Sequence, residues 1–499
     1  MTISLVACVA HYRNQLAIGK NNNLLFLLKK DLAYFKNLTK HVMSSGSHVS
    51  MNVVVMGKNT WFSIPAENRP LKGRINIVLT NDTKLLKVSQ KLSRKEPNDT
   101  DAYFMTFSDF TKFYRERNPN TFVIGGGIIY SKFLNTPELK PDTLYITELK
   151  GVAFDHDNIP DSFMEPPDSS YRLVGVSSKV HEEDSQLSYR RLIYKLFREN
   201  MSQETQYLDL CRDIMQNGID REDRTGVGTK SIFGKQLRFD ISQSVPLLTT
   251  KRVSFRGIIE ELLFFCSGNT DTKLLEKRGV NIWRGNTSRE FLDNRGLYHY
   301  DEGVMGPMYG WSWRNFGGKY SQAFADTYNL DMSKLDGFDQ LTHVENMLKT
   351  DPFSRRIFIS NLNPKESSQM ALEMCHVYFQ LYVTEINNQK YLSGHFVMRS
   401  NDLGCGFPFN LVSYTVLIYI LALRCGMKPK EIVYTCSDCH VYKDHFDGLS
   451  AQISRNTRPF PKLLLDPAIK HIDWKDMTYS HFELAGYMPH ASIPLKMAI

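Results

Sequence analysis

A thiol and an imidazole stand side by side at Cys375 and His376, directly before a run rich in aromatic and β-branched residues. That run predicts a buried strand from residue 377 onward. A free cysteine has a pKa of about 8.5, so it needs cationic neighbours to be a thiolate near neutral pH. Arginines are available at Arg355-Arg356 upstream and at Arg399 downstream. The pattern indicates a nucleophile at a strand end, although a Cys-His pair alone is more commonly a buried structural pair.

Two carboxylates in apolar surroundings are the next candidates for chemistry. Asp31 lies beside the apolar face of a predicted helix over residues 28–36. Partial desolvation there raises the pKa of a carboxyl group and suits proton transfer. An ordinary first-turn aspartate that interacts with the helix dipole is an equally good local interpretation. Glu261 interrupts an apolar helical run over residues 258–265, where a charge is costly unless it is used or hydrogen-bonded.

Two strand–glycine–helix turns offer backbone N–H groups to an anion. The first runs from residues 53–56 into Gly57-Lys58, and the second from residues 121–124 into Gly125-Gly126-Gly127. Such a turn lets a phosphate approach the N-terminus of a helix. The spacing departs from the full dinucleotide-binding pattern, so each turn alone is a weak signal.

Length, composition and charge indicate the class of protein that carries these groups. A chain of 499 residues with 42% hydrophobic and 23% charged residues is globular and too long for one core. The net charge of +8 lies mostly before residue 200. It is not clustered enough to indicate nucleic acid, and it favours anionic small substrates.

Eight scattered cysteines and a start without a charged-then-apolar leader predict a cytoplasmic, reducing environment. The longest apolar run, residues 411–425, contains several polar residues. It is too short and too polar for a membrane span and predicts a buried helix, so we expect no membrane partner.

Motifs in the first part of the chain resemble those of the dihydrofolate reductase family. They are Asp31-Leu32-x-x-Phe35-Lys36, Gly57-Lys58-x-Thr60-Trp61, Arg69-Pro70-Leu71-x-Gly73-Arg74 and Ile124-Gly125-Gly126-Gly127-x-x-Tyr130. The resemblance implies an α/β domain over residues 1–199, with a mixed, mostly parallel twisted sheet flanked by helices. It also implies reduction of dihydrofolate with NADPH.

By this resemblance Asp31 binds the edge of the pterin ring and promotes protonation at nitrogen 5, and Thr147 orients it. Phe35 packs on the substrate, and Arg74 pairs with the glutamate α-carboxylate of the folate, a bidentate contact that suits a guanidinium. The implied NADPH-binding residues are Ala10, Gly19, Lys58, Asn59, Thr60, Thr80, Gly125, Gly126, Gly127 and Tyr130.

The second part of the chain resembles thymidylate synthases. The matching motifs are Asp351-Pro352-x-Ser354-Arg355-Arg356, Cys375-His376, Arg399-Ser400-Asn401-Asp402, Pro408-Phe409-Asn410 and Asp438-Cys439-His440-Val441-Tyr442. The resemblance implies an α+β domain over residues 200–499, whose large sheet is used in dimerisation, and methylation of dUMP to dTMP with methylene-tetrahydrofolate. The order of the two parts is similar to that of the bifunctional dihydrofolate reductase–thymidylate synthase family. The pairing makes chemical sense, because the synthase oxidises its folate to dihydrofolate and the reductase restores it.

The synthase resemblance also implies residue roles. Cys375 attacks carbon 6 of the pyrimidine. The other implied catalytic residues are Glu261, Tyr309 and His376, which organise proton transfer and water, Arg399 beside the sulfur, and Asp402, which binds the pterin ring. Trp283 and Asn286 line the folate site. The implied dUMP-binding residues are Arg224, Arg355, Arg356, Ser400, Asn410, His440 and Tyr442, of which Arg355 and Arg356 come from the partner subunit of a homodimer. No metal is implied.

Several positions depart from the two family patterns. Leu25-Phe26 replaces a Pro-Trp pair in the reductase loop, and Lys29 replaces a proline just before the acidic residue. Glu373-Met374 replaces a proline pair before Cys375, and Met398 replaces a glutamine. We expect slower turnover or altered inhibitor response in the reductase, and a Cys375 pKa raised by the charge of Glu373.

Other interpretations remain open at this point. Cys436-Ser437-Asp438-Cys439-His440 fits a C-x-x-C-H haem attachment pattern, and with His445 it could form a metal site. A pyrimidine hydroxymethylase would use water in place of hydride, although Asn410 favours uracil over cytosine. The chain could also be a binding protein with decayed activity, or a synthase that keeps an inactive reductase as a scaffold.

Overall fold

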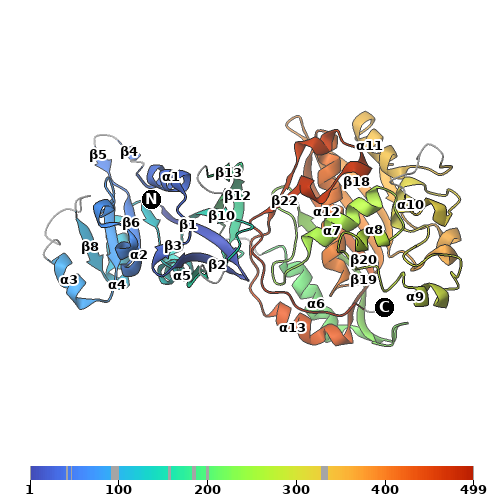
Figure 1. The fold of residues 1–499 in the computed structure, drawn as a ribbon, viewed down its shortest axis with the longest axis horizontal. Coiled ribbons are helices and arrows are strands. Elements are labelled where there is room, and N and C mark those ends of the chain that lie inside the picture. The colour runs from blue at the N-terminus through green and yellow to red at the C-terminus, as the bar shows by residue number, and fades with distance from the viewer. Residues whose placement is uncertain are drawn as a thin grey trace. The chain divides into compact units, whose positions relative to one another are not determined.

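The structure is a computed structural model that describes residues 2–40, 43–45, 48–90, 101–154, 159–182, 187–197, 202–326 and 335–497. The chain divides into two compact units, Met1–Ser202 and Gln203–Ile499 (Figure 1). Each unit contains its own sheet and its own core. Strand β14 (Ser188–Leu196) is the last element of the first unit, and helix α6 (Thr205–Asn217) is the first of the second.

The first unit is built on a sheet with the strand order β12-β14-β10-β1-β9-β6-β7-β8. The strands from β10 to β8 pair in parallel, whereas β14 and β12 are antiparallel. The mixed, mostly parallel sheet is therefore confirmed. Its strands are β1 (Ile3–Tyr12), β6 (Val53–Gly57), β7 (Ile75–Leu79), β8 (Ala102–Met105), β9 (Thr121–Val123), β10 (Thr143–Leu149), β12 (Tyr171–Val176) and β14.

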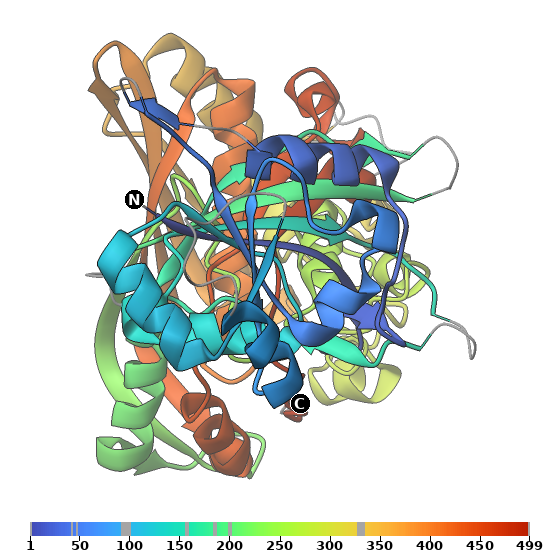
Figure 2. The same cartoon turned by 90° about the vertical axis from the view of Figure 1, so that its left-hand side faces the viewer.

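Helices cover both faces of this sheet (Figure 2). On one face Trp61 of α2 (Lys58–Ser63) and Leu38 of α1 (Lys29–Lys40) pack on the strand residues Val54 and Met56. On the other face lie α4 (Phe107–Arg117) and α5 (Gly127–Asn135), joined to each other by a ring contact between Phe110 and Phe133. Because β6 is buried along its whole length, it has the continuous apolar sequence of a parallel-sheet strand.

The sequence predicts a loop over residues 11–23 after the opening strand and a polar, mobile segment over residues 84–101. The structure differs at both. The expected loop over residues 11–23 contains strand β2 (Gln15–Lys20), which forms a hairpin with β1 through a turn in which Arg13 has a φ of 53°. The polar segment expected to be mobile over residues 84–101 begins with helix α3 (Thr83–Gln90), which packs on β8. The remainder of that segment, residues 91–100, lies outside the described residues.

The second unit has a six-stranded sheet with the order β15-β16-β20-β19-β18-β17. Among its described strands only β19 and β20 pair in parallel, connected by a helix, and the other pairs are antiparallel, which confirms the α+β prediction. The strands are β15 (Ile219–Arg221), β16 (Thr229–Asp240), β17 (Phe358–Ser360), β18 (His376–Ile386), β19 (Gln389–Asp402) and β20 (Lys428–Tyr442).

Helix α12 (Gly406–Arg424) fills the core of this unit together with α7 (Phe255–Cys266). Its Tyr414 ring stacks on Phe396 of β19 with a centroid distance of 3.5 Å. By length and composition α12 could cross a membrane, and 72% of its most apolar stretch is buried inside the fold. This is the buried helix predicted for residues 411–425.

Candidate active sites

A cavity of about 510 Å³ opens where β18 begins and where β19 and β20 end, beside α7 and the start of α12. It brings together residues that are far apart in the chain, such as Arg224 and Tyr442. All the predicted synthase residues except two line it: Arg224, Glu261, Trp283, Asn286, Tyr309, Cys375, His376, Arg399, Ser400, Asp402, Asn410, His440 and Tyr442. The two exceptions, Arg355 and Arg356, are exposed just before β17 and do not line this cavity.

The thiol of Cys375 lies in a loop that Arg399 holds in place. The Arg399 guanidinium donates from Nε to the Met374 carbonyl at 2.9 Å and from Nη2 to the Glu373 carbonyl at 3.0 Å. Burial raises the pKa of the Cys375 thiol, the positive charges of Arg399 and Arg224 oppose that rise, and the Glu373 carboxylate adds to it. The effect of Glu373 has the predicted direction. An anion bound to the arginines would weaken their support for the thiolate.

Glu261 and His376 line the cavity with Tyr309, and burial shifts their pKa values in opposite directions. Burial raises the pKa of Glu261 to about 7, although the Trp283 indole donates to its Oε1 at 2.8 Å. Burial lowers the pKa of His376 to about 3, so that imidazole is neutral, and its Nδ1 lies 3.1 Å from the Tyr414 hydroxyl. The Cys375 N–H donates to the Tyr309 hydroxyl at 3.2 Å. Glu261 is therefore the group that can exchange a proton near neutral pH.

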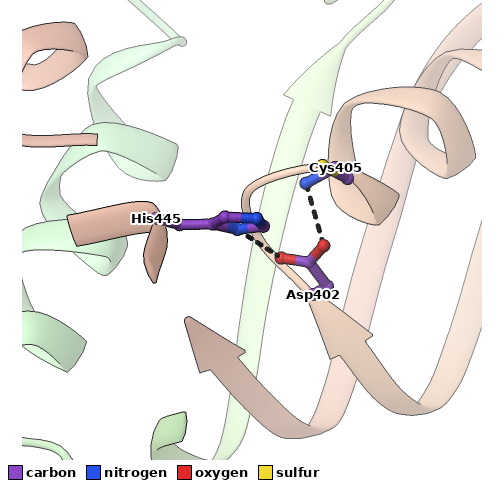
Figure 3. A group of neighbouring side chains, drawn as sticks. All are labelled: Asp402, Cys405 and His445. Carbon is purple, nitrogen blue, oxygen red and sulfur yellow. Dashed lines mark hydrogen bonds and ion pairs between the residues drawn. The ribbon is translucent and has the colours of Figure 1, made fainter. Parts of the chain in front are cut away.

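Asp402, the last residue of β19, also lines the cavity, and it contacts His445 and the backbone at Cys405 (Figure 3). The Gly404 N–H donates to Oδ1 at 2.7 Å, the Cys405 N–H donates to Oδ2 at 3.1 Å, and His445 Nδ1 lies 3.7 Å from Oδ1. Burial opposes the charge, but His445 and these N–H groups lower the pKa of Asp402 below its usual value. The result is a fixed negative charge that can accept hydrogen bonds from a ligand.

The C-x-x-C-H motif lies inside strand β20. Cys436 and Cys439 are buried, and their thiols donate to backbone carbonyls of the same strand. His440 faces the cavity, and His445 lies with Asp402 rather than with the two thiols. Within the described residues, the group that could ligate a metal is Asp402, Cys405 and His445. His445 Nε2 already lies 2.7 Å from the Lys496 carbonyl, so this group is explained by its hydrogen bonds.

A second cavity, of about 1110 Å³, lies in the first unit between α2, α5 and the ends of the parallel strands. Of the predicted NADPH-binding residues, Gly19, Lys58, Asn59, Thr60, Thr80, Gly125, Gly126, Gly127 and Tyr130 line it. Ala10 does not line this cavity and is almost fully buried, 1% exposed. At Gly125, φ is +126° and an added Cβ would lie 3.3 Å from the Tyr130 hydroxyl, so the turn requires glycine.

Asp31 lies in the first turn of α1, where it accepts a hydrogen bond of 2.6 Å from the Thr147 hydroxyl of β10. Burial raises the pKa of Asp31, and Thr147 opposes the rise. Phe35 lies one turn further along α1, and the guanidinium carbon of Arg74, just before β7, lies 5.7 Å from the centroid of its ring. Arg74 is 4% exposed. Arg74 donates to the Thr39 hydroxyl at 2.8 Å, and its buried Nε has no hydrogen-bond partner among the described residues.

Sequence reasoning missed three charged groups at these sites. Lys251 is 7% exposed and donates from Nζ to the Gly404 carbonyl at 2.6 Å, next to Asp402. His445 was considered only as a metal ligand. Arg191 of β14 lies beside Asp31. Lys251 stands in a noticeable Thr-Thr-Lys-Arg run, whereas the other two are distant in sequence from the carboxylates that they contact.

Comparison with known proteins identifies a family for each unit. The dihydrofolate reductase family matches residues 2–196, and the thymidylate synthase family matches residues 205–499. A bifunctional dihydrofolate reductase-thymidylate synthase from Zea mays is 36% identical over 97% of this chain and 95% of its own length. Those from Paramecium tetraurelia and Leishmania major are 38% and 34% identical, each over 97% of this chain and over 96% and 93% of their own lengths.

The two units and their cavities thus define a folate-dependent enzyme with two reaction centres in one chain. The chain belongs to the bifunctional dihydrofolate reductase–thymidylate synthase family. It converts dUMP to dTMP with methylene-tetrahydrofolate and reduces the resulting dihydrofolate to tetrahydrofolate, so it is both a methyltransferase and an oxidoreductase of folate metabolism. NADPH and folates are the cosubstrates that these families use.

Proposed function

We propose that Cys375 is the nucleophile of the synthase, and that its thiolate adds to carbon 6 of the dUMP pyrimidine. The support is its place in the cavity between Arg399, Arg224 and Tyr309. Addition at carbon 6 makes carbon 5 nucleophilic, and carbon 5 then takes the one-carbon unit of the folate. Hydride from the same folate completes the methyl group, the Cys375–carbon bond breaks, and dTMP and dihydrofolate leave. This single thiol among paired cations carries the proposal.

Glu261 is proposed to relay protons during these steps, since its pKa of about 7 lets it both give and take a proton near neutral pH. Tyr309 and neutral His376 would order water around it. Asp402 would accept hydrogen bonds from the pterin ring, and Trp283 would form a wall of the folate site. Asn286 lines the same cavity, and its buried side-chain nitrogen has no partner among the described residues, so it can donate to a ligand.

For dUMP itself, we propose that Arg224, Arg399 and Ser400 bind the phosphate. Asn410 would pair with the carbonyl and N–H of uracil, and His440 with Tyr442 would hold the ribose hydroxyl. His440 and Tyr442 alternate along β20 with their rings 5.3 Å apart and both line the cavity. A hydroxymethylase would give a product heavier than dTMP by one oxygen, so the mass of the nucleotide product decides between the two reactions.

We propose a homodimer formed by the sheet of the synthase unit. Large apolar side chains are exposed on its strands, including Phe233 (83%), Tyr382 (63%) and Phe358 (47%). Exposed apolar surface of this kind marks an interaction site. Arg355 and Arg356 lie beside Phe358 and outside their own cavity, which fits the proposal that they reach the phosphate bound in the partner's site.

In the reductase unit we propose that Asp31 binds the pterin edge and supports protonation at nitrogen 5, with Thr147 as its orienting partner. Phe35 and Arg74 would bind the rest of the folate, because Arg74 keeps a buried, unpartnered Nε beside Phe35. NADPH supplies the hydride. The turns at Gly57-Lys58 and Gly125-Gly126-Gly127 would hold its phosphates, with Lys58 and Thr80 near the ribose 2′-phosphate.

The proposed domains are residues 1–199 for the reductase and 200–499 for the synthase, and the site residues are proposed to act without a metal. We also propose a cytoplasmic, reducing location. All eight cysteines are free, and Cys375 must stay a thiol to react.

The test uses purified protein with dUMP, methylene-tetrahydrofolate and NADPH in one tube. dTMP is followed by mass and NADPH by absorbance. We expect both to change in step, Cys375→Ala to stop both, and Asp31→Asn to stop only NADPH oxidation. Rapid dTMP formation by Cys375→Ala would contradict the nucleophile. NADPH left untouched by the wild-type protein, even with added dihydrofolate, would contradict a working reductase and favour the scaffold interpretation.

A further inference from the structure

The carboxylate of Asp31 has a cationic neighbour on the strand beside its hydroxyl partner. Thr147 of β10 and Arg191 of β14 are paired residues in the antiparallel ladder between these strands. Thr147 donates to Asp31 Oδ1 at 2.6 Å, and Arg191 Nε lies 3.7 Å from the same oxygen. Both side chains therefore reach the start of α1 from one place in the sheet.

Arg191 is packed into this position from several sides. Its guanidinium carbon lies 4.2 Å from the ring centroid of Tyr34. Its Nη2 lies 3.3 Å from both the Lys30 carbonyl and the Tyr189 hydroxyl, to which it donates. The side chains of Arg191 and Asp31 are only 22% and 15% exposed. Its Nε is buried without a hydrogen-bond partner among the described residues, and the nearest carboxylate oxygen is that of Asp31.

We propose that Arg191 is a positioning residue of the reductase, which holds Asp31 in place and keeps its carboxylate ionised beside the bound pteridine. The inference rests on the proposed role of Asp31. The guanidinium of Arg191 lies over the Tyr34 ring and donates a hydrogen bond to the Lys30 carbonyl in the first turn of α1. It therefore fixes the position of the helix start relative to the Asp31 carboxylate. A planar guanidinium is suited to this because it can stack and donate at once.

Other charged and titratable groups also face Asp31. Glu182 accepts hydrogen bonds from the Lys30 N–H and the Tyr189 hydroxyl, each at 3.1 Å, and its negative charge opposes ionisation of Asp31. The buried thiol of Cys8 and the phenol of Tyr34 also lie within electrostatic range. Burial and Glu182 raise the pKa of Asp31, whereas Thr147 and Arg191 lower it. Arg191 is thus the positive charge that offsets Glu182.

The test compares Arg191→Met with Arg190→Met, a matched control one position away on the same strand. Because reduction consumes a proton, the rate falls as pH rises past the titration of the group that supports protonation. Without Arg191 that titration moves to higher pH. We expect the ratio of reductase rates at pH 8 and pH 6 to rise about threefold or more in Arg191→Met, which equals half a pH unit. Arg190→Met should keep the wild-type ratio, and Arg191→Lys, which keeps the charge without the planar group, should lie between.

A second measurement does not depend on activity. NMR of ¹³C-labelled aspartate carboxyl groups follows the titration of Asp31, whose signal is assigned by its absence in Asp31→Asn. In Arg191→Met this titration should also move to higher pH. Synthase activity of each variant reports that the second unit is intact, and the melting temperature of the first unit reports that the reductase is folded. Unchanged pH behaviour in both measurements, with only a lower melting temperature, would reduce Arg191 to a structural role. A wild-type reductase rate in Asp31→Asn would overturn the proposed role of Asp31 itself. An inactive Asp31→Asn, together with a wild-type ratio of rates at pH 8 and pH 6 in Arg191→Met, would overturn this inference alone.

Discussion

Two buried aspartates, one in each unit, have pKa values shifted in opposite directions. Asp31 has a raised pKa, and Asp402 has a lowered one. Burial raises both. Asp31 has one hydroxyl donor at 2.6 Å and an arginine at 3.7 Å, with Glu182 nearby. Asp402 instead accepts two backbone N–H groups and faces His445.

The difference shows that the groups in contact with a buried carboxylate, rather than its depth of burial, determine the direction of its pKa shift. The lowered pKa of Asp402 comes first from His445, then from His440, and last from the Gly404 N–H, which cannot be titrated. For Asp31, burial together with Glu182 outweighs Thr147 and Arg191, so its pKa stays raised. One carboxylate is built as a permanent anion that anchors a ligand, and the other is closer to protonation and suits proton chemistry.

The largest expected effect comes from removing the permanent charge. Asp402→Asn keeps the shape but loses the anion and presents a side-chain N–H where an acceptor is needed. We expect synthase kcat/KM to fall by about 100-fold or more, while the reductase rate stays within twofold of wild type. Asp444→Asn is the control, because Asp444 is a more exposed carboxylate 3.9 Å from His445 Nε2. A synthase within threefold of wild type would remove Asp402 from the pterin site.

The next effect tests the side-chain support of Asp31. Thr147→Val removes the 2.6 Å hydrogen bond and leaves the carboxylate with Arg191 as its nearest cation. We expect the reductase rate at pH 7 to fall about tenfold, since the loss of a charge-assisted hydrogen bond costs roughly 1.5 kcal/mol or more. Thr143→Val, in the same strand and bonded to Lys195, is the matched control. Equal losses in the two variants would indicate a general effect on β10.

A smaller effect concerns the cation beside Asp402. His445→Gln removes a charge partner, and since the pKa of Asp402 is lowered by that partner, it should rise. Protonated Asp402 is the inactive form, so the synthase should lose activity at the acidic end of its pH range. We expect a loss of about fivefold at pH 5.5 and little change at pH 8. The exposed His471→Gln serves as the control, and a loss that is uniform across pH would contradict the electrostatic role.

Much of this comparison could be predicted from the sequence, and the missing part has a physical cause. The strands, the glycine turns, Asp31 and Cys375 follow from local patterns of residue types, and most of the synthase cavity follows from the family resemblance. The partners that set the two pKa values do not. Arg191 and His445 reach Asp31 and Asp402 through strand pairing and through the loop after β20. No local periodicity of side chains records such contacts.

The same contrast predicts opposite effects on stability, and these are the smallest. For Asp402 the folded-state pKa is below the unfolded one, so the carboxylate stabilises the fold above the unfolded pKa and loses that contribution as pH falls through the folded pKa. For Asp31 the folded-state pKa is above the unfolded one, so the contribution is favourable only when the group is protonated, and it declines as pH rises.

At pH 7, Asp402→Asn should therefore lower the melting temperature of the synthase unit by about 2 °C, and Asp31→Asn should raise that of the reductase unit by a similar amount. Hydrogen-exchange mass spectrometry along a temperature series reads the two units separately within one chain. The gain from Asp31→Asn should shrink as the pH falls, because the wild-type carboxyl takes up its proton in the folded protein before it does so in the unfolded chain. If both variants moved their units in the same direction at pH 7, burial rather than the neighbouring groups would govern the two carboxylates.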